Sequence, residues 1–437
     1  MAYSNTSISL AFIFLLIQAF SFVAHAIVPA NETFQLINEG DFGDYIIEYD
    51  GNYRPLNVFA SPFQLCFYNT TPNAYTLALR MGLVRSESLF RWVWEANRGN
   101  PVGENATLTF GTDGNLVLAD ADGRIAWQTG TANKGVVGFQ LLRNGNMVLY
   151  DSKGNYVWQS FDHPTDTLLV GQTLSLGGPN KLVSRASDQE NVNGPYSLVL
   201  DPKGFYMYYT SKNSPKPMIY FNLFGDISSE QVGTLDYVKF ISQPYNDEGS
   251  AYELILEYKV ANSTHSGNSI IARPNYNSTL TFLRLGIDGT LKAYTYYDPV
   301  FEMAWQVTYT LFTREDGEEC QLPERCGNFG LCEDSQCVAC PLPSGLMGWS
   351  KNCQPPKLAS CKDFKYYKVE GVDHFLSKYT RGTADTEVKC STKCSSDCKC
   401  LGYFYNQETS RCWIAYDLKT LTKVANSTHV GYIKAPK

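Results

Sequence analysis

Residues 144–158 read Asn144-Gly-Asn-Met-Val-Leu-Tyr-Asp-Ser-Lys-Gly-Asn-Tyr-Val-Trp158, and residues 113–127 read Asp113-Gly-Asn-Leu-Val-Leu-Ala-Asp-Ala-Asp-Gly-Arg-Ile-Ala-Trp127. Both stretches place Asn-Gly or Asp-Gly at a turn, followed by an apolar strand, a second turn and a strand that ends in tryptophan. Asp-Gly and Asn-Gly favour hairpins because they supply the positive φ that tight turns demand. Two copies at this spacing predict a β-architecture built from stacked hairpin units.

Weaker copies of the same signal occur at residues 201–207 and 288–294, and they predict a second β-rich domain between about 170 and 310. The chain has 437 residues, with 29 tyrosines, 24 phenylalanines and 7 tryptophans, and aromatic residues favour strands. Its length leaves room for three or four domains.

An apolar stretch over residues 8–24 precedes Ala24-His25-Ala26, which matches the small-x-small pattern of a signal-peptidase site. Polar residues interrupt the stretch, and its core is short for a membrane anchor, the alternative interpretation. We therefore expect a cleaved signal peptide at 1–26 and an exported mature chain without a membrane span. Six sequons in that mature chain predict N-glycosylation on surface loops, at Asn31, Asn69, Asn105, Asn262, Asn277 and Asn426.

Twelve of the 13 cysteines lie between residue 320 and the C-terminus, a density that is typical of oxidising compartments. They form two sets of six, over 320–353 and 361–412, and each set can close three bridges internally. Sequence alone allows fifteen pairings within a set of six. The odd cysteine, Cys66, is expected to be buried and unreactive; an intermolecular disulfide is the alternative.

The net charge is −7 and the isoelectric point is about 5.4, which argues against a nucleic-acid partner because phosphate binding needs a basic face. The chain has only five histidines, and one of them lies in the predicted signal peptide. No nucleophile elbow, metal cluster or acid–base pair appears in the sequence. We expect no enzyme activity, no catalytic residue, no metal ligand and no cofactor.

Four stretches together resemble the bulb-type, mannose-binding lectin domain of plants, in the version found in S-locus glycoproteins. They are Trp92-Val-Trp-Glu-Ala-Asn-Arg98, the two repeats, and Trp158-Gln-Ser-Phe-Asp-His-Pro-Thr-Asp-Thr167. The group of epidermis-specific secreted glycoproteins is the most similar. The resemblance implies a mostly β chain with tandem β-prism II lectin-like domains, each of three four-stranded sheets, then an EGF-like module and a small α+β PAN/apple module. The implied boundaries are 27–168 and 169–315 for the lectin-like domains, 316–354 for the EGF-like module and 355–437 for the PAN/apple-like module.

The family's sugar sites follow the pattern Gln-x-Asp-x-Asn-x-Val-x-Tyr, in which alternate strand residues share one face. Both copies here are degenerate. The second lacks Gln and has Asn in place of Asp, and the first lacks Gln and Tyr. Each missing side chain removes a hydrogen bond that would contribute about 0.5–1.5 kcal/mol to sugar binding. The candidate carbohydrate-binding residues are Asn144, Asn146, Val148 and Tyr150 in the second copy, and Asp113, Asn115 and Val117 in the first. In the alternative interpretation, these residues only shape turns and fill the core.

The resemblance also implies the disulfide pairing. In the EGF-like set it is Cys320–Cys332, Cys326–Cys337 and Cys340–Cys353, and in the PAN-like set it is Cys390–Cys412, Cys394–Cys400 and Cys361–Cys398. A short helix is expected at 386–396, with Cys390 and Cys394 on one face at i, i+4.

The leading function is a secreted lectin of the apoplast or cell wall that binds mannose-type glycans, such as the N-glycans of partner glycoproteins. The alternative is a sugar-blind extracellular scaffold that uses the same surfaces for protein contacts. The sequence does not specify an oligomeric state.

Overall fold

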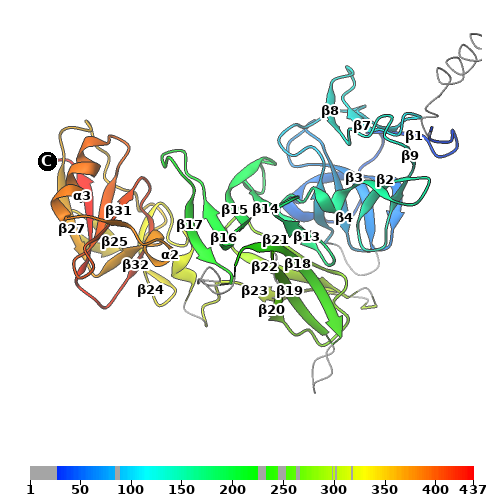
Figure 1. Cartoon of the computed structure of the whole chain (residues 1–437). Helices are drawn as coiled ribbons and strands as arrows, with labels where there is room; N and C mark the ends of the chain where they lie inside the picture. Colours follow the sequence, from blue (N-terminus) through cyan, green and yellow to red (C-terminus); the bar gives the residue numbers. More distant parts are fainter. Residues whose placement is uncertain are drawn as a thin grey trace, which may run out of the picture.

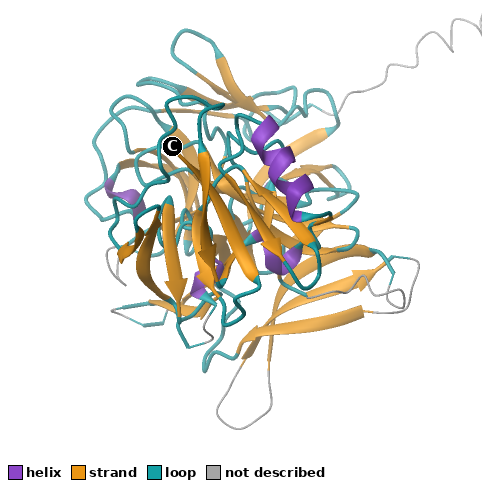
Figure 2. Cartoon of the chain, turned by 90° about the vertical axis from the view of Figure 1, so that its left-hand side faces the viewer, coloured by secondary structure: helices purple, strands orange, loops and turns teal. Residues whose placement is uncertain are grey.

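The computed structural model describes residues 27–83, 89–224, 233–244, 252–261, 266–297, 299–300, 303–315 and 318–437. The predicted signal peptide and Asn262 lie outside these residues. The chain is elongated, with its N-terminal third, its middle and its C-terminal part following one another along the molecule (Figure 1). Strands dominate and helices are few (Figure 2). The mostly β fold expected from the hairpin repeats is confirmed.

Three antiparallel sheets make up the first lectin-like domain. One sheet has the order β1 (Phe34–Ile37), β6 (Thr107–Phe110), β7 (Leu116–Ala119) and β8 (Ile125–Gln128). The second has the order β11 (Tyr156–Gln159), β10 (Met147–Asp151) and β9 (Val136–Leu141). The third has the order β2 (Asn52–Ala60), β3 (Phe63–Asn69), β4 (Thr76–Met81) and β5 (Arg91–Glu95). Short 3₁₀ turns, η1 (Glu48–Asp50) and η3 (Ser160–Asp162), flank these sheets.

The three sheets repeat one local geometry around a tryptophan cluster. In each sheet a buried leucine faces a tryptophan across the last strand pair, and the register shifts at the next residue: Leu79↔Trp94, Leu118↔Trp127 and Leu149↔Trp158. The three indoles pack edge to face, with ring centroids 5.7, 5.8 and 6.2 Å apart. Such T-shaped pairs add to the apolar burial of each ring. The structure therefore contains a third copy of the hairpin repeat, at β3–β5, beside the two that the sequence showed.

The second lectin-like domain has three four-stranded sheets. Their orders are β12 (Thr167–Leu169), β21 (Thr281–Leu285), β22 (Leu291–Tyr296) and β23 (Trp305–Thr310); β13 (Thr173–Ser175), β18 (Leu235–Pro244), β19 (Tyr252–Val260) and β20 (Ser266–Ala272); and β14 (Lys181–Arg185), β15 (Asn193–Asp201), β16 (Gly204–Tyr209) and β17 (Met218–Asn222). The positions that match the tryptophans of the first domain hold Phe221, Ala272 and Tyr309, each followed by the same register shift. Loss of the tryptophans explains why the sequence repeats here are weak.

The C-terminal part is built on two five-stranded sheets. One has the order β26 (Gly345–Gly348), β25 (Gln336–Leu342), β24 (Phe329–Glu333), β32 (Lys419–Lys423) and β28 (Val372–His374), after the 3₁₀ turn η4 (Glu319–Gln321). The other has the order β27 (Lys365–Glu370), β33 (His429–Ala435), β30 (Gly402–Asn406), β31 (Arg411–Ala415) and β29 (Thr383–Ala384). Strands β24 and β32 pair in parallel, so the segments predicted as EGF-like and PAN-like share one sheet. Their identity as separate modules stays a prediction.

Two helices, α2 (Leu376–Tyr379) and α3 (Glu387–Ser396), lie in this C-terminal part. Helix α3 confirms the expected helix: Thr386 caps its first turn, and Cys390 and Cys394 are both buried on one face. The structure joins the twelve clustered cysteines in six pairs, the same pairs that the family resemblance implies. None of these six disulfides connects the two sets.

The described sequon asparagines differ in exposure. Asn31, Asn105, Asn277 and Asn426 are exposed, as expected for glycan acceptors. Asn69 is the exception, because it ends strand β3 with only 5% of its surface exposed. The prediction that it lies on a surface loop is wrong: a tripeptide match carries no information on whether the asparagine is paired in a sheet.

Candidate carbohydrate-binding faces

The second repeat begins with a turn that its own side chains hold in place. The Asn144 Oδ1 accepts a hydrogen bond from the Asn146 backbone N–H at 3.1 Å, and Gly145 between them has φ of 84°. This positive φ is the one that the Asn-Gly pair predicted. Asn146 then ties the turn to the last strand: its Nδ2 donates to Gln159 Oε1 at 2.8 Å, and its Oδ1 accepts from Ser160 Oγ and from the Phe161 backbone N–H, both at 3.2 Å.

The first repeat has the same arrangement in detail. Asp113 Oδ1 accepts from the Asn115 backbone N–H at 3.0 Å, and Asn115 Nδ2 donates to Gln128 Oε1 at 2.9 Å. The Asn115 Oδ1 accepts from Thr129 Oγ1 at 3.0 Å and from the Thr131 backbone N–H at 3.1 Å. Both copies therefore use the asparagine of the pattern as an internal clamp.

This geometry corrects part of the sequence prediction. Asn115 and Asn146 are only 7% and 3% exposed, and Val148 is fully buried. These side chains were expected to face a sugar, but two of them bind the protein itself and the third lies in the interior. Asn144 and Asn146 also precede β10, so the pattern does not run along one strand face. The sequence pattern specifies the turn as strongly as it would specify a sugar site, so spacing alone could not separate the two roles.

Other side chains of the second copy remain accessible. Cross-strand register places Gln140, Val148 and Gln159 side by side, and of these Gln140 is exposed. Tyr150 is half-buried and its ring lies over Gly138, where an added Cβ would come within 2.5 Å of the ring. Tyr156, its register partner, is 51% exposed. With exposed Asn144, this face offers two amides and two phenols.

The first copy lacks those groups. The residues at the positions of Gln140, Tyr150 and Tyr156 are Thr109, Ala119 and Ile125. Half-buried Val117 occupies the position of Val148, and exposed Asp113 is the polar residue at the turn. The two copies thus share a backbone and differ in what they present to solvent.

The third copy faces the second lectin-like domain. Its register equivalents of Gln140, Val148 and Gln159 are Cys66, Ala78 and Glu95, all buried. Cys66 lies among Tyr53, Tyr68, Phe90 and Trp92, and burial raises the pKa of its thiol to about 12. The expectation of a buried free cysteine is confirmed.

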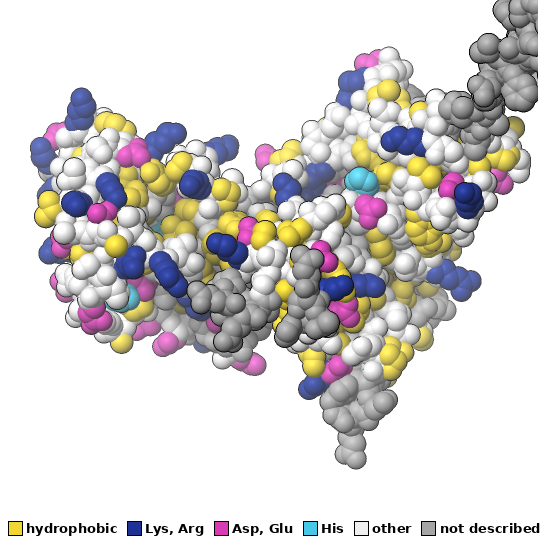
Figure 3. Space-filling view, in the orientation of Figure 1, with side chains coloured by type: hydrophobic (Ala, Val, Ile, Leu, Met, Phe, Trp, Pro, Cys, Tyr) yellow, Lys and Arg dark blue, Asp and Glu magenta, His cyan; other side chains and the backbone are white. Residues whose placement is uncertain are grey.

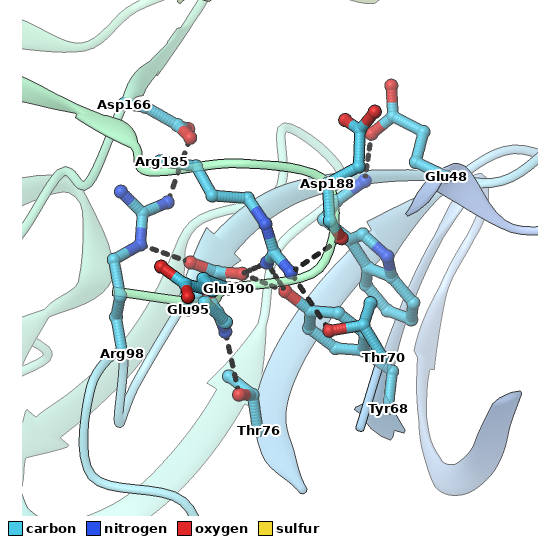
Figure 4. A network of polar contacts seen from close by, with 12 residues as sticks. Glu48, Tyr68, Thr70, Thr76, Glu95, Arg98, Asp166, Arg185, Asp188 and Glu190 are labelled. Carbon is cyan, nitrogen blue, oxygen red and sulfur yellow. Dashed lines mark hydrogen bonds and ion pairs between the residues drawn. The ribbon is translucent and has the colours of Figure 1, made fainter. Parts of the chain in front are cut away.

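Buried ion pairs join this third face to the second domain (Figure 4). Arg185, which is 1% exposed, donates from Nη1 to the Tyr68 hydroxyl at 2.7 Å and lies 3.6 Å from Glu95. Glu95 also accepts from Tyr68 and, at 2.5 Å, from Arg98 Nε. Asn191 Nδ2 donates to Thr76 Oγ1 at 2.7 Å.

Two more carboxylates complete the network. Arg98 Nη2 binds Asp166 at 2.8 Å, and Arg284 Nη1 contacts both carboxylate oxygens of Glu48 at 2.9 Å. Burial alone would raise the pKa of Asp166, but Arg98 and Arg284 outweigh it and hold that pKa below its usual value. Sequence analysis missed this network; its only sequence signal was the pair of charges in Trp94-Glu-Ala-Asn-Arg98.

Among the described residues, no helix is both long and apolar enough to cross a bilayer. Within the same residues, no cluster of three His, Cys, Asp or Glu side chains is arranged to hold a metal ion.

Comparison with known proteins identifies the family of this chain. Residues 91–186 match the family model described as D-mannose binding lectin. The chain is 52% identical to EP1-like glycoprotein 3 of Arabidopsis thaliana, over 98% of both chains. It is 60% identical to the epidermis-specific secreted glycoprotein EP1 of Daucus carota, over 83% of this chain and 97% of the relative. Among solved structures, the Japanese Marasmius oreades lectin matches 27% of this chain and 95% of its own at 25% identity, with a TM-score of 0.18. Near-complete overlap with the EP1-like proteins shows that this chain belongs to the EP1 family of glycoproteins with a bulb-type lectin domain.

Proposed function

We propose that this protein is a secreted lectin that binds mannose-type glycans weakly, on the N-glycans of partner glycoproteins in the cell wall. The site is the exposed face of the second repeat. The observation that carries the proposal is the set of accessible groups there: Gln140, Asn144, Tyr150 and Tyr156 supply amides for sugar hydroxyls and rings for the apolar side of a pyranose. The match of residues 91–186 to a family described as mannose-binding supports it.

Binding at this face is expected to be weak because Asn146 is already bonded to the protein. A sugar would gain only the contacts of the remaining groups, each about 0.5–1.5 kcal/mol. Multivalent display of glycans on a partner would raise the overall avidity without new contacts.

The test is retention of the purified glycoprotein on an immobilised high-mannose glycoprotein, with Gln140→Ala and Tyr150→Phe variants. Each should weaken binding by a few-fold to about tenfold. Thr109→Ala, at the matching register position of the first repeat, is the control and should bind as wild type. Equal retention of all four proteins would place the sugar elsewhere.

A second candidate is a sugar-blind scaffold that uses these faces for protein contacts. The engagement of both asparagine clamps inside the protein favours it, because neither amide is left for a ligand. Failure of wild-type protein to bind any mannose-type glycan on an array would select this function.

A further inference from the structure

A groove of about 840 Å³ lies between the second lectin-like domain and the C-terminal part. Strands β16 and β17 contribute Tyr206 and Asn222, and the turn before β16 contributes Lys203. The opposite wall is formed by α2, the segment after it, and β31. This volume is within the roughly 300–1,000 Å³ typical of ligand clefts.

Cationic side chains line the groove, and none of its described lining residues is a carboxylate. Lys203, Arg381 and Arg411 form no ion pair or side-chain hydrogen bond among the described residues. Lys378 is paired with Glu318 at 3.2 Å. The surplus of positive charge is regional: residues 318–437 carry 16 Lys and Arg against 13 Asp and Glu, although the whole chain has a net charge of −7. Lys and Arg side chains are numerous on the C-terminal lobe and near its junction with the middle of the molecule (Figure 3).

Three aromatic residues, Tyr206, Tyr379 and Trp413, line the same groove and are held in place by the protein. The Trp413 Nε1–H donates to the Thr380 hydroxyl at 2.9 Å and to its carbonyl oxygen at 3.1 Å. The Tyr206 hydroxyl donates to the Lys203 carbonyl oxygen at 3.2 Å, and Tyr379 packs edge to face on Phe221 at 5.7 Å. Fixed rings of this kind bind the apolar face of a sugar ring at small entropic cost.

One hydroxyl group in the wall of the groove has no hydrogen-bond partner in the described part of the chain. This hydroxyl belongs to Ser377 and is buried. A buried hydroxyl without a partner is destabilising, so Ser377 is a polar position in the groove wall whose hydrogen-bonding capacity is unused.

We propose that this groove binds an acidic oligosaccharide, a chain of uronic acids with a carboxylate on each ring. The rings of such a chain would pack on the aromatic side chains, and its carboxylates would bind Lys203, Arg381 and Arg411. An acidic peptide shares the negative charge but has no pyranose faces for the three aromatic residues. The site is separate from the second repeat of the first domain and does not depend on mannose binding there.

The register of the sheets relates the groove to the second repeat of the first domain. Tyr206 and Asn222 face each other next to the Met207↔Phe221 pair, as Val148 and Gln159 do next to Leu149↔Trp158. The groove therefore opens on the face of the second domain that corresponds to the glycan-binding face proposed for the first. On this face the opposite wall comes from the C-terminal part, which supplies the two arginines.

The experiment is isothermal titration of the full-length glycoprotein with a short oligomer of galacturonic acid, at low and raised ionic strength. We expect saturable binding that weakens with salt, because exposed charges are screened. The fully methyl-esterified oligomer has the same rings without the charges and should bind much more weakly. Poly-glutamate binding as tightly as the uronic acid oligomer would instead identify an acidic peptide as the ligand and overturn the proposal.

The variant for this test is Lys203→Gln/Arg381→Gln/Arg411→Gln. It should weaken uronic acid binding about tenfold and leave retention on a mannose column unchanged. The matched control removes three exposed lysines of the C-terminal part outside the groove, as Lys351→Gln/Lys357→Gln/Lys365→Gln, with the same change in net charge. Equal weakening by both triple variants would show a non-specific effect of net charge and refute the groove as the site.

Discussion

The second and third repeats of the first domain share one backbone geometry, but the face of the second is accessible and the face of the third is buried. At matching register positions, the second repeat has Gln140, Val148 and Gln159, and of these side chains Gln140 is exposed to solvent. The third has Cys66, Ala78 and Glu95, and its face is closed by the second domain. Where the second repeat has the neutral amide of Gln159, the third has the carboxylate of Glu95, which contacts Arg98 and Arg185. The same strand geometry can thus present an exposed surface in one repeat and form a contact between domains in another.

The largest expected effect comes from breaking the closed face. Glu95→Ala leaves Arg98 and Arg185 buried without their shared partner, and loss of one member of a buried ion pair costs about 3–5 kcal/mol. Denaturant unfolding followed by tryptophan fluorescence measures it. Gln159→Ala, at the same register position of the open face, should cost only about 1 kcal/mol. Similar losses in the two variants would show that the third face is not an ionic interface.

The asparagine clamps give the next effect. Asn146→Ala removes three hydrogen bonds and should destabilise the first domain by about 1–3 kcal/mol. Asn115→Ala should cost a similar amount, because its contacts are the same in kind. Thermal unfolding tests both. If the Asn146→Ala protein were folded and fully stable but no longer bound mannose, Asn146 would be a sugar-binding residue and not a structural one.

Acid should destabilise the closed third face through protonation of Asp166. The folded-state pKa of Asp166 lies below its ordinary value, so its stabilising contribution is present above the unfolded carboxyl pKa of about 3.9 and is lost as pH falls through the folded pKa. Urea unfolding between about pH 5 and pH 2 should show this loss. The Asp166→Asn variant should be less stable at neutral pH, and its free energy of unfolding should fall less steeply as the pH is lowered. If the variant and the wild type lost stability equally with falling pH, the pKa of Asp166 would not differ between the folded and unfolded states.

The smallest effect concerns accessibility alone. Cys66 and Gln140 hold the same register position, one fully buried and one exposed. With the pKa of its thiol raised to about 12, Cys66 should react with iodoacetamide only after denaturation. In a Gln140→Cys variant the new thiol should react at once in folded protein, with stability nearly unchanged. Mass spectrometry reads both sites, and rapid native labelling of Cys66 would contradict a closed third face.

Local signals in the sequence were enough for much of the fold. The turns of the first two repeats are visible because Asp113-Gly114 and Asn144-Gly145 fix their own conformation. The helix at α3 was predicted with Cys390 and Cys394 spaced i, i+4 on one face. The third repeat was not visible, since the turn before β4 has no Asp-Gly or Asn-Gly pair and only register places Leu79 opposite Trp94.

The candidate site was harder to predict than the fold. The same Asn-x-Val spacing serves a sugar site or a turn clamp, and the outcome depends on partners such as Gln159 and Ser160 across the sheet. The ion pairs that close the third face join residues far apart, with Glu48 and Arg284 separated by 236 positions. No local pattern encodes such a pair.

The parallel pairing of β24 with β32 has a consequence for how this protein is degraded. The segment between Cys353 and Cys361 has no regular structure and includes two adjacent prolines. The disulfides of these two cysteines, Cys340–Cys353 and Cys361–Cys398, lie on opposite sides of the segment and do not span it. A protease that cuts there releases no fragment at once, because four register pairs and the Lys419–Glu324 contact at 2.6 Å still join the halves. The cut protein would migrate as one species in a native gel. It would separate into two fragments under denaturing conditions, even without a reducing agent.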